Sequence, residues 1–258
     1  GQAICFYYDV LNRLEGKVFE PNGAACPGAP ATYDVTYGYD SGGAAANALG
    51  QRTSISDDVG SVSWTDVSWT YDARGRLETV SRNFTNIAPL DSSNNPDNPY
   101  TFSYEYNSAS QVTILTYPDG EQVITTYNDR GMPKGLDGTD TYVDAAQTQY
   151  DILGRLTQLE LGNSITTAYN YYPFTTDGGR LENLTVEGNL LDLTYTYDNA
   201  GNITTIEDTS SAIVDQTQTF TYDTLHRLVM ANTSGSALGE YNLTYGYDSL
   251  GRLVDKGG

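Results

Sequence analysis

The feature of this sequence that most constrains its fold is a short phrase that recurs at a fixed interval. Copies of the phrase begin with Tyr-Asp at Tyr197, Tyr222 and Tyr247, so successive copies lie 25 residues apart. Each copy follows a segment in which aromatic residues alternate with Thr or Gly, and this period of two is typical of a β-strand with two different faces. A fixed period built from strand and turn residues indicates a repeat architecture.

The phrase itself predicts a tight turn. The leading tyrosine is followed by Asp, two variable residues, Gly, usually Arg, and an aliphatic residue. An Asp that bonds to the backbone ahead of it, with Gly three positions later, is typical of a type I turn closed by a residue at positive φ. Asn12 and His226 take the glycine position in two copies, and both residue types tolerate positive φ. We therefore predict that each copy is one β-hairpin.

Copies of the phrase occur along the whole chain. The leading tyrosines of ten expected hairpins are Tyr8, Tyr39, Tyr71, Tyr106, Tyr127, Tyr150, Tyr172, Tyr197, Tyr222 and Tyr247. The residues that we expect to form the clearest signature turns are Tyr8, Asp9, Asn12, Tyr71, Asp72, Gly75, Tyr150, Asp151, Gly154, Tyr197, Asp198, Gly201, Tyr222, Asp223, His226, Tyr247, Asp248 and Gly251. The phrase that follows Tyr106, from Asn107 to Val112, is degenerate.

These copies predict one repeat array over residues 1–258, irregular over 1–126 and regular over 127–258. Clusters of Pro, Asn, Asp and Ser predict an inserted surface loop at 86–98. No segment sustains a period of 3.6 residues, so we expect almost no helix. The expected fold class is all-β, with antiparallel β-hairpins that follow one another in a spiralling sheet.

The full phrase Tyr-Asp-x-x-Gly-Arg-Leu occurs at Tyr71–Leu77, Tyr150–Leu156 and Tyr247–Leu253, and it resembles the RHS/YD repeat family. The resemblance covers nearly the whole chain. It implies a long strip of β-hairpins that in larger members closes into a hollow shell, as in insecticidal toxin complexes, bacterial polymorphic toxins and animal teneurins. Toxin members of the family also carry a self-cleaving Asp-Pro-x-Gly element, which does not occur within these 258 residues.

Composition excludes some classes of partner. The chain is 38% hydrophobic, enough for a sizeable core, and its formal net charge is −20. Nucleic acid is an unfavourable partner because backbone binding needs a basic surface, and an anionic membrane is unfavourable for the same reason. No stretch approaches the ~20 apolar residues of a membrane-spanning helix. The acidity indicates either a solvated, turn-rich surface or turn carboxylates that bind divalent cations, but no EF-hand loop occurs.

The only two cysteines, Cys5 and Cys26, are close together in the sequence. Two cysteines allow one disulfide and do not make a metal site by themselves. We expect a disulfide between them if the protein is extracellular, and two reduced, buried thiols otherwise.

The sequence offers little for catalysis. His226, the only histidine, occupies a turn position, and no other side chain completes a Ser-His-Asp arrangement with it. The adjacent acids Asp57 and Asp58 are more typical of a solvated turn than of a glycosidase pair. We therefore predict a protein that is not an enzyme and that uses no cofactor or metal.

Two surface features could bind or carry sugar. The tyrosine stripe, with Trp64 and Trp69, could stack on sugar rings; alternatively these rings pack against the next hairpin and their hydroxyls reach water. Five Asn-x-Ser/Thr sequons would suit a glycosylated secreted protein, although chance explains them in a chain this rich in Asn and Thr; they begin at Asn83, Asn183, Asn202, Asn232 and Asn242.

The repeat leads to three functional hypotheses. A hairpin array with uncapped ends exposes unpaired strand edges, and we expect these edges to pair with other chains. The first hypothesis is a secreted structural protein at the cell surface that assembles head-to-tail into a filament, sheath or shell. The second is a shell fragment of a larger toxin-delivery or adhesion protein, whose flanking repeats are its partners. The third is a carbohydrate-binding module.

Overall fold

The computed structural model describes residues 3–20, 24–26, 28, 30–58, 64–85, 99–210, 215–235 and 239–258. The expected inserted loop at 86–98 lies outside these residues. Contacts divide the chain into two compact units, the first made of Gly1–Thr125 with Asp137–Thr139 and the second of Thr126–Leu136 with Asp140–Gly258. The prediction of one repeat array over residues 1–258, irregular over 1–126 and regular over 127–258, stays a prediction.

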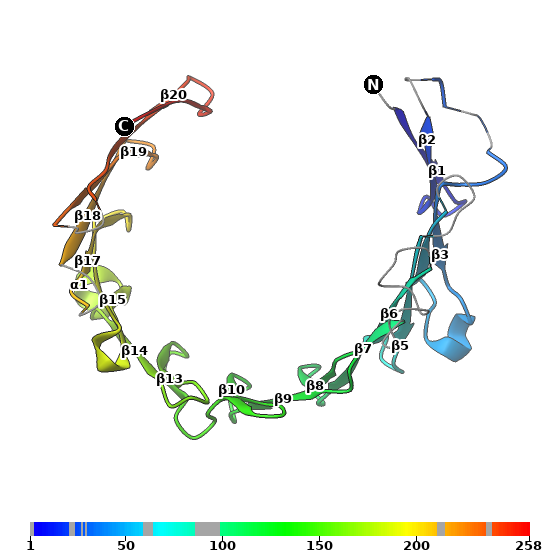
Figure 1. The fold of residues 1–258 in the computed structure, drawn as a ribbon, viewed down its shortest axis with the longest axis horizontal. Coiled ribbons are helices and arrows are strands. Elements are labelled where there is room, and N and C mark those ends of the chain that lie inside the picture. The colour runs from blue at the N-terminus through cyan, green and yellow to red at the C-terminus, as the bar shows by residue number, and fades with distance from the viewer. Residues whose placement is uncertain are drawn as a thin grey trace. The chain divides into compact units, whose positions relative to one another are not determined.

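Strands dominate the described residues of both units (Figure 1). In chain order they are β1 (Ala3–Tyr8), β2 (Leu14–Glu20), β3 (Val35–Tyr39), β4 (Arg52–Asp57), β5 (Thr65–Tyr71), β6 (Leu77–Phe84), β7 (Tyr100–Tyr106), β8 (Val112–Thr116), β9 (Gln122–Tyr127), β10 (Pro133–Asp137), β11 (Thr141–Val143), β12 (Gln149–Tyr150), β13 (Leu156–Glu160), β14 (Thr166–Tyr171), β15 (Leu181–Val186), β16 (Leu191–Tyr197), β17 (Ile203–Asp208), β18 (Gln216–Tyr222), β19 (Leu228–Ser234), β20 (Asn242–Tyr247) and β21 (Leu253–Gly257).

The expectation of an all-β fold with almost no helix is confirmed. The described residues contain one α-helix of a single turn, α1 (Phe174–Asp177), and short 3-10 turns at Gly43–Ala46 and Glu187–Asn189. Within the part of the chain that the structure describes, no helix has the length and apolar character needed to cross a membrane.

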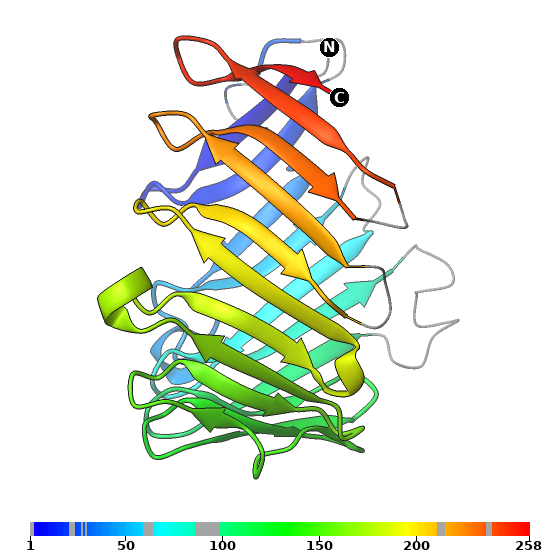
Figure 2. The ribbon, with the colours of Figure 1, turned by 90° about the vertical axis from the view of Figure 1, so that its left-hand side faces the viewer.

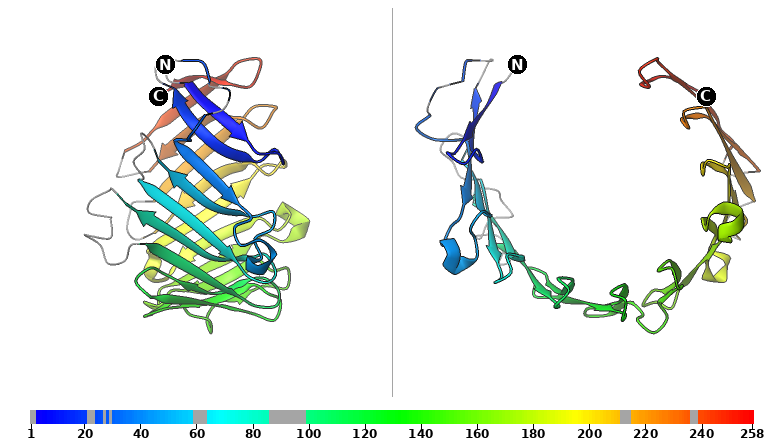
Figure 3. Two further views of the ribbon diagram at one scale, coloured as in Figure 1. Left: turned by 90° about the vertical axis from the view of Figure 1, so that its right-hand side faces the viewer. Right: turned by 180° about the vertical axis from the view of Figure 1, so that it is seen from behind.

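Strand order follows chain order in each unit. In the first unit, consecutive strands from β1 to β9 are antiparallel neighbours, as the blue to green hairpins of Figure 3 show. In the second unit the same holds from β12 to β21. The signature turns of its hairpins lie on one side of the sheet, at the ends of the strands (Figure 2). The strands form two sheets, so β1 and β11 are the edge strands of one sheet, and β12 and β21 are those of the other.

Alternation along each strand gives the sheets two unlike faces. In the second unit, the paired residues Tyr195 and Ile206 share one face, whereas Thr196, Thr205 and Thr219 share the other. The first unit repeats this pattern, with Trp69 opposite Val80 and Thr70 opposite Thr79. One face is therefore aromatic and aliphatic, and the other carries mainly small hydroxyl residues.

The expectation of a sizeable core was wrong. Among the described residues only Cys5, Ala48 and Ala231 are buried hydrophobic residues, and most other apolar side chains are half-buried. The reason is that each unit forms a sheet without a second layer packed on it, so its rings lie against neighbouring hairpins of the same sheet. Stability then depends on contacts between successive hairpins, as in other repeat proteins.

Candidate functional site

The signature turn is a network built around one aspartate. In the hairpin of β5 and β6, the Asp72 carbonyl accepts the Gly75 N–H at 2.8 Å, and the Asp72 N–H donates to the Arg76 carbonyl at 2.9 Å. The Asp72 Oδ1 atom accepts the backbone N–H groups of Arg74 and Arg76. The Asp72 Oδ2 atom accepts Arg76 Nε at 2.7 Å. One side chain therefore satisfies three donors, which explains why Asp or Asn is favoured after the leading tyrosine.

The same network recurs along the chain. Asp9, Asp151, Asp223 and Asp248 make the same two backbone bonds and the same bond to an arginine. At Asp198 the partner is Asn202 instead of an arginine. The fourth turn residue has positive φ in each of these hairpins, including Asn12 (61°) and His226 (60°). A bulge lies next to the turn in each hairpin, beside the leading tyrosine.

The leading tyrosine joins each hairpin to the one before it. The Tyr106 hydroxyl donates to the Leu77 carbonyl at 2.7 Å, and Leu77 directly follows Arg76 of the preceding turn. Seven further tyrosines donate to the equivalent carbonyl of the preceding hairpin: Tyr39, Tyr71, Tyr150, Tyr171, Tyr197, Tyr222 and Tyr247. The hydroxyls of these eight tyrosines therefore bond to protein, and the expectation that they reach water was wrong.

The turn arginine completes this contact. The Arg76 guanidinium lies 4.4 Å from the centre of the Tyr106 ring and donates to the Asn107 carbonyl at 3.1 Å. Guanidinium–ring contacts of the same kind join Arg13 to Tyr39, Arg155 to Tyr171, Arg180 to Tyr197 and Arg227 to Tyr247. We call this arrangement a clasp: the arginine and the following carbonyl of one hairpin, bound to the leading tyrosine of the next.

The seventh leading tyrosine was assigned to the wrong residue. Tyr171, and not Tyr172, pairs with Leu181 next to the bulge and donates to the Leu156 carbonyl. Tyr172 takes the position of the aspartate, because its N–H donates to the Arg180 carbonyl, and its hydroxyl bonds to the Tyr195 carbonyl. Two adjacent tyrosines with an expanded turn made the sequence ambiguous here.

Two turns that follow predicted leading tyrosines, Tyr106 and Tyr127, carry Asn in place of the aspartate. At 107–111, Asn107 replaces the aspartate, and Ser110 has a φ of 64° in the glycine position. The phrase that we described as degenerate therefore forms the standard turn. At 128–132, Asn128 bonds to the backbone of Arg130 and Met132. An Asn three residues before a small or polar residue could have identified the turn at 107–111 as well, since an amide oxygen accepts the same backbone bonds as a carboxylate.

The clasp shifts the pKa of its acidic groups. The side-chain hydrogen bond from Arg76 lowers the pKa of Asp72, and backbone N–H groups add to the effect. The pKa of Asp9, Asp223 and Asp248 is also lowered, with the backbone N–H of the turn arginine as the leading cause. Partial burial raises the pKa of Tyr106, Tyr171 and Tyr197. The turns therefore favour charged aspartates and neutral tyrosines.

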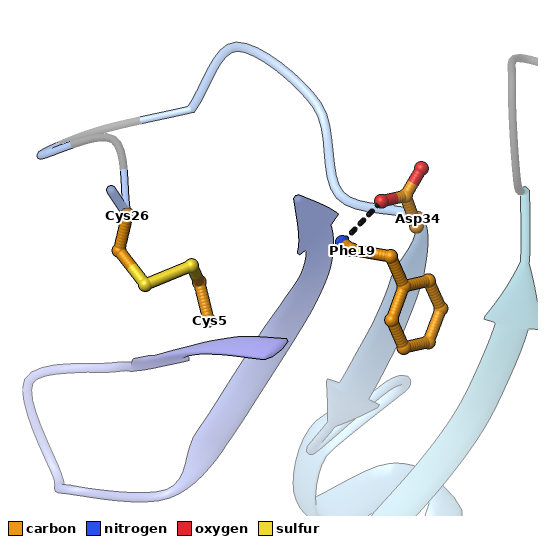
Figure 4. The surroundings of a disulfide bond; sticks show 4 residues. All are labelled: Cys5, Phe19, Cys26 and Asp34. Atoms are coloured by element: carbon orange, nitrogen blue, oxygen red, sulfur yellow. Dashed lines mark hydrogen bonds between the residues drawn. A yellow bond between two sulfur atoms is a disulfide. The ribbon is translucent and has the colours of Figure 1, made fainter. Parts of the chain in front are cut away.

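A disulfide fastens the first hairpin to the loop that follows it. The Sγ atoms of Cys5 and Cys26 are 1.99 Å apart, and their Cα atoms are 5.5 Å apart (Figure 4). Cys5 is 1% exposed. Farther along the same loop, Asp34 accepts the Phe19 N–H at 2.7 Å and donates its own N–H to the Lys17 carbonyl. The loop is thus held to β1 by the disulfide and to β2 by the backbone and side chain of Asp34.

The remaining candidates do not form a reactive cluster in the described residues. His226 lies in its turn with Nδ1 3.0 Å from Asn202 Nδ2. Asp58 accepts the Ser56 hydroxyl, while the neighbouring Asp57 lies at the end of β4. No group of three or more His, Cys, Asp or Glu side chains in the described residues could hold a metal. Trp64 is 40% exposed, and Asn183 and Asn202 use their amide groups within the fold.

The hairpins that contain β1 and β21 each present half of a clasp. At β21, the Arg252 side chain is 74% exposed, whereas Arg13, Arg76, Arg155 and Arg227 are 22–29% exposed. At β1, Tyr8 is 55% exposed. One edge therefore offers the arginine of a clasp and the other offers the tyrosine.

Comparison with known proteins supports the fold. No family model and no curated protein matches this sequence. The Tc holotoxin pore of Photorhabdus luminescens is similar in structure, with 19% sequence identity, a TM-score of 0.69, and coverage of 99% of this chain and 14% of that chain. Crystal structures of TcdB2-TccC3 and of TcdB2-TccC3-Cdc42 are each 16% identical, with TM-scores of 0.63 and 0.54. They cover 96% and 99% of this chain and 15% and 17% of theirs.

These similarities show that the chain has the fold of RHS shell structures, in agreement with the resemblance of its Tyr-Asp phrases. The chain spans 14 to 17% of the length of these chains.

Proposed function

We propose that this chain is a non-catalytic wall segment of a larger RHS-type shell, in which further hairpins join it at both edges. The observation that carries the proposal is the pair of half clasps on β1 and β21. Tyr8 has the position from which other tyrosines donate to a preceding hairpin, and Arg252 has the position from which other arginines cover a following ring. Hairpins with the same phrase would complete both clasps and cover both open edges.

The protein as isolated from its source tests this proposal. An antibody against this chain should detect a polypeptide much larger than 28.1 kDa, and electron microscopy of that material should show closed hollow particles. Monomeric particles of a 28.1 kDa polypeptide would contradict the proposal.

A second candidate is head-to-tail self-assembly into an extracellular filament or sheath. The same half clasps favour it, because they are complementary and the Tyr8 edge of one copy could join the Arg252 edge of another. Such a contact does not close on itself and so gives a filament. Filaments built from 28.1 kDa subunits in the source material would support this candidate over the shell.

An extracellular or cell-surface location suits both candidates. The Cys5–Cys26 disulfide persists in oxidising compartments and is rare in the cytosol. A wall segment also needs no catalytic group, and the tyrosines are engaged in clasps. In freshly isolated protein, without added oxidant, we expect Cys5 and Cys26 to resist alkylation because they form a disulfide. Free thiols at both positions would contradict an extracellular or cell-surface location.

A further inference from the structure

The turn between β3 and β4 is enlarged. The Asp40 N–H donates to the carbonyl of Gln51, eleven positions on, whereas the Asp72 N–H donates to Arg76, four positions on. The enlarged loop is folded: Asp40 Oδ1 accepts the Gly50 N–H at 2.6 Å, and Asn47 Nδ2 donates to the Tyr71 carbonyl of the next hairpin at 3.2 Å. Insertions in a repeat array often form its binding face.

This loop covers a pocket on the first unit. Ser41, Ala46 and Ala48 of the loop line the pocket with Thr53 of β4 and Trp69 of β5, and its volume is about 210 Å³. Ala48 is 2% exposed and Thr53 is 6% exposed, so the inner wall is well buried. Sites for drug-sized ligands have volumes of about 300–1,000 Å³, so this pocket suits a single ring.

Another enlarged turn carries an aromatic ring where the loop after β3 carries alanines. Between β14 and β15, Phe174 of the loop lies 5.3 Å from the Arg155 guanidinium, and a Cβ on Gly179 would meet the Phe174 ring at 2.6 Å. That loop lays an aromatic ring beside Arg155 and Gly179, and the residue is 61% exposed. The loop after β3 instead carries Ala44, Ala45 and Ala46, whose side chains are small.

The lining combines an aromatic ring with hydroxyl groups. Trp69 contributes an indole, and the Thr53 hydroxyl oxygen accepts the Ser41 N–H at 3.4 Å. A threonine hydroxyl has one donor and two acceptor positions, so Thr53 can also bond to a ligand, as can the hydroxyl of Ser41. None of the described residues that line the pocket is charged. The fitting ligand has one apolar face, several hydroxyls and no charge.

We propose that this pocket binds a single neutral pyranose ring, such as the terminal hexose or N-acetylhexosamine of a glycan. The apolar face of the sugar packs on Trp69, and its hydroxyls bond to Thr53 and Ser41. An acidic sugar is disfavoured because the chain has a formal net charge of −20. This site is independent of the proposed shell function, since it needs only the first unit.

Tryptophan fluorescence of the full chain tests the site. A Trp64→Phe variant leaves Trp69 as the only reporter, because the chain has two tryptophans. Titration with glucose, galactose, mannose and N-acetylglucosamine should give a saturable change for at least one sugar, in the millimolar range expected of a weak single-ring ligand. Saturation-transfer NMR on the unsubstituted chain measures the same binding if Trp64→Phe does not fold.

Two matched leucine variants distinguish the pocket from general effects. Ala46 lines the pocket and Ala45 does not, and both are exposed residues of the same 3-10 turn. Ala46→Leu should weaken sugar binding at least tenfold, whereas Ala45→Leu should leave it unchanged. Absence of any signal with all four sugars by both methods would overturn the proposal. Equal weakening of sugar binding by Ala46→Leu and Ala45→Leu would also overturn it. So would a pocket that binds a small apolar probe but none of the four sugars.

Discussion

At the scale of single residues, tyrosine is suited to this fold because one side chain makes two kinds of contact. The ring of Tyr106 receives the Arg76 guanidinium, and its hydroxyl reaches the Leu77 carbonyl. Phenylalanine would keep the first contact and lose the second. A sheet with few enclosed side chains gains from such bonds, since a half-buried carbonyl at each bulge would otherwise lack a partner.

Replacing Tyr106 by Phe should therefore destabilise the protein by about 1 kcal/mol, the usual net contribution of one hydrogen bond. Tyr8→Phe is the matched control, because Tyr8 occupies the same turn position but lies on an open edge and is 55% exposed. Urea denaturation followed by circular dichroism measures both. An equal loss in the two variants would show that the hydroxyl bond in the clasp contributes nothing.

The glycine position depends on backbone conformation. Gly75 has a φ of 73°, and an added Cβ would meet only Gln51 Nε2 at 3.5 Å, so the cost of a side chain is conformational and not steric. Gly75→Val should cost about 1–2 kcal/mol, and Gly75→Asn clearly less, as Asn12 in the same position suggests. Ala73→Val in the same turn is the control and should be nearly neutral. Thermal melting compares the three variants, and equal melting temperatures would contradict the account.

At the scale of the element, the turn is a charge network whose strength depends on pH. The pKa of Asp72 is lowered in the folded protein, so its contribution to stability is complete above the unfolded pKa of about 3.9 and is lost as the pH falls toward the folded value. Asp72→Asn should keep the turn, as Asn107 does naturally, but should reduce the loss of stability between pH 5 and pH 3. Denaturation midpoints across that range measure the difference, and parallel pH profiles would refute it.

The first hairpin has a covalent element that the others lack in the described residues. The Cys5–Cys26 bond closes a loop with a sequence separation of 21. A disulfide that closes a loop of this length restricts the unfolded chain and so stabilises the folded state by about 3 kcal/mol. The double variant Cys5→Ser, Cys26→Ser should therefore exchange the amide hydrogens of β1 and β2 much faster. The amides of β18 and β19, in the second unit, are the internal control. Unchanged exchange in β1 and β2 would show that the strand pairing alone holds this hairpin.

How much of this could be predicted from the sequence depends on the kind of contact. Turns are local, so the spacing of Asp72 and Gly75 was enough to predict their hairpin. The same rule, positive φ three positions after the aspartate, predicted the conformation of His226. The clasp is not local. Tyr106 and Leu77 are 29 positions apart, and only the order of strands in the sheet brings them together. The assignment of Tyr172 failed for this reason: spacing could not choose between two adjacent tyrosines, whereas the bond from Tyr171 to Leu156 does.

At the scale of the whole molecule, stability and assembly depend on the same contact. Each hairpin added to an array covers the exposed arginine of the previous one and exposes its own. A further hairpin would cover Arg252 of the turn and Leu253 at the start of β21, whose exposures are 74% for the Arg252 side chain and 54% for the Leu253 residue. The addition of a further hairpin next to β21 should therefore stabilise the hairpin of β20 and β21.

Appending a second copy of residues 234–258 after Gly258, which keeps the 25-residue spacing of the leading tyrosines, tests this coupling. The leading tyrosine of the added copy should donate to the Leu253 carbonyl and receive the Arg252 guanidinium, as Tyr247 does with Leu228 and Arg227. Amide exchange in β21 should then slow at least tenfold, because its outward groups become paired. The control is the same extension with Arg252→Ala and with its own leading tyrosine changed to Phe, which should protect β21 less. Equal protection by both extensions would mean that strand pairing alone, without the clasp, drives the addition of hairpins.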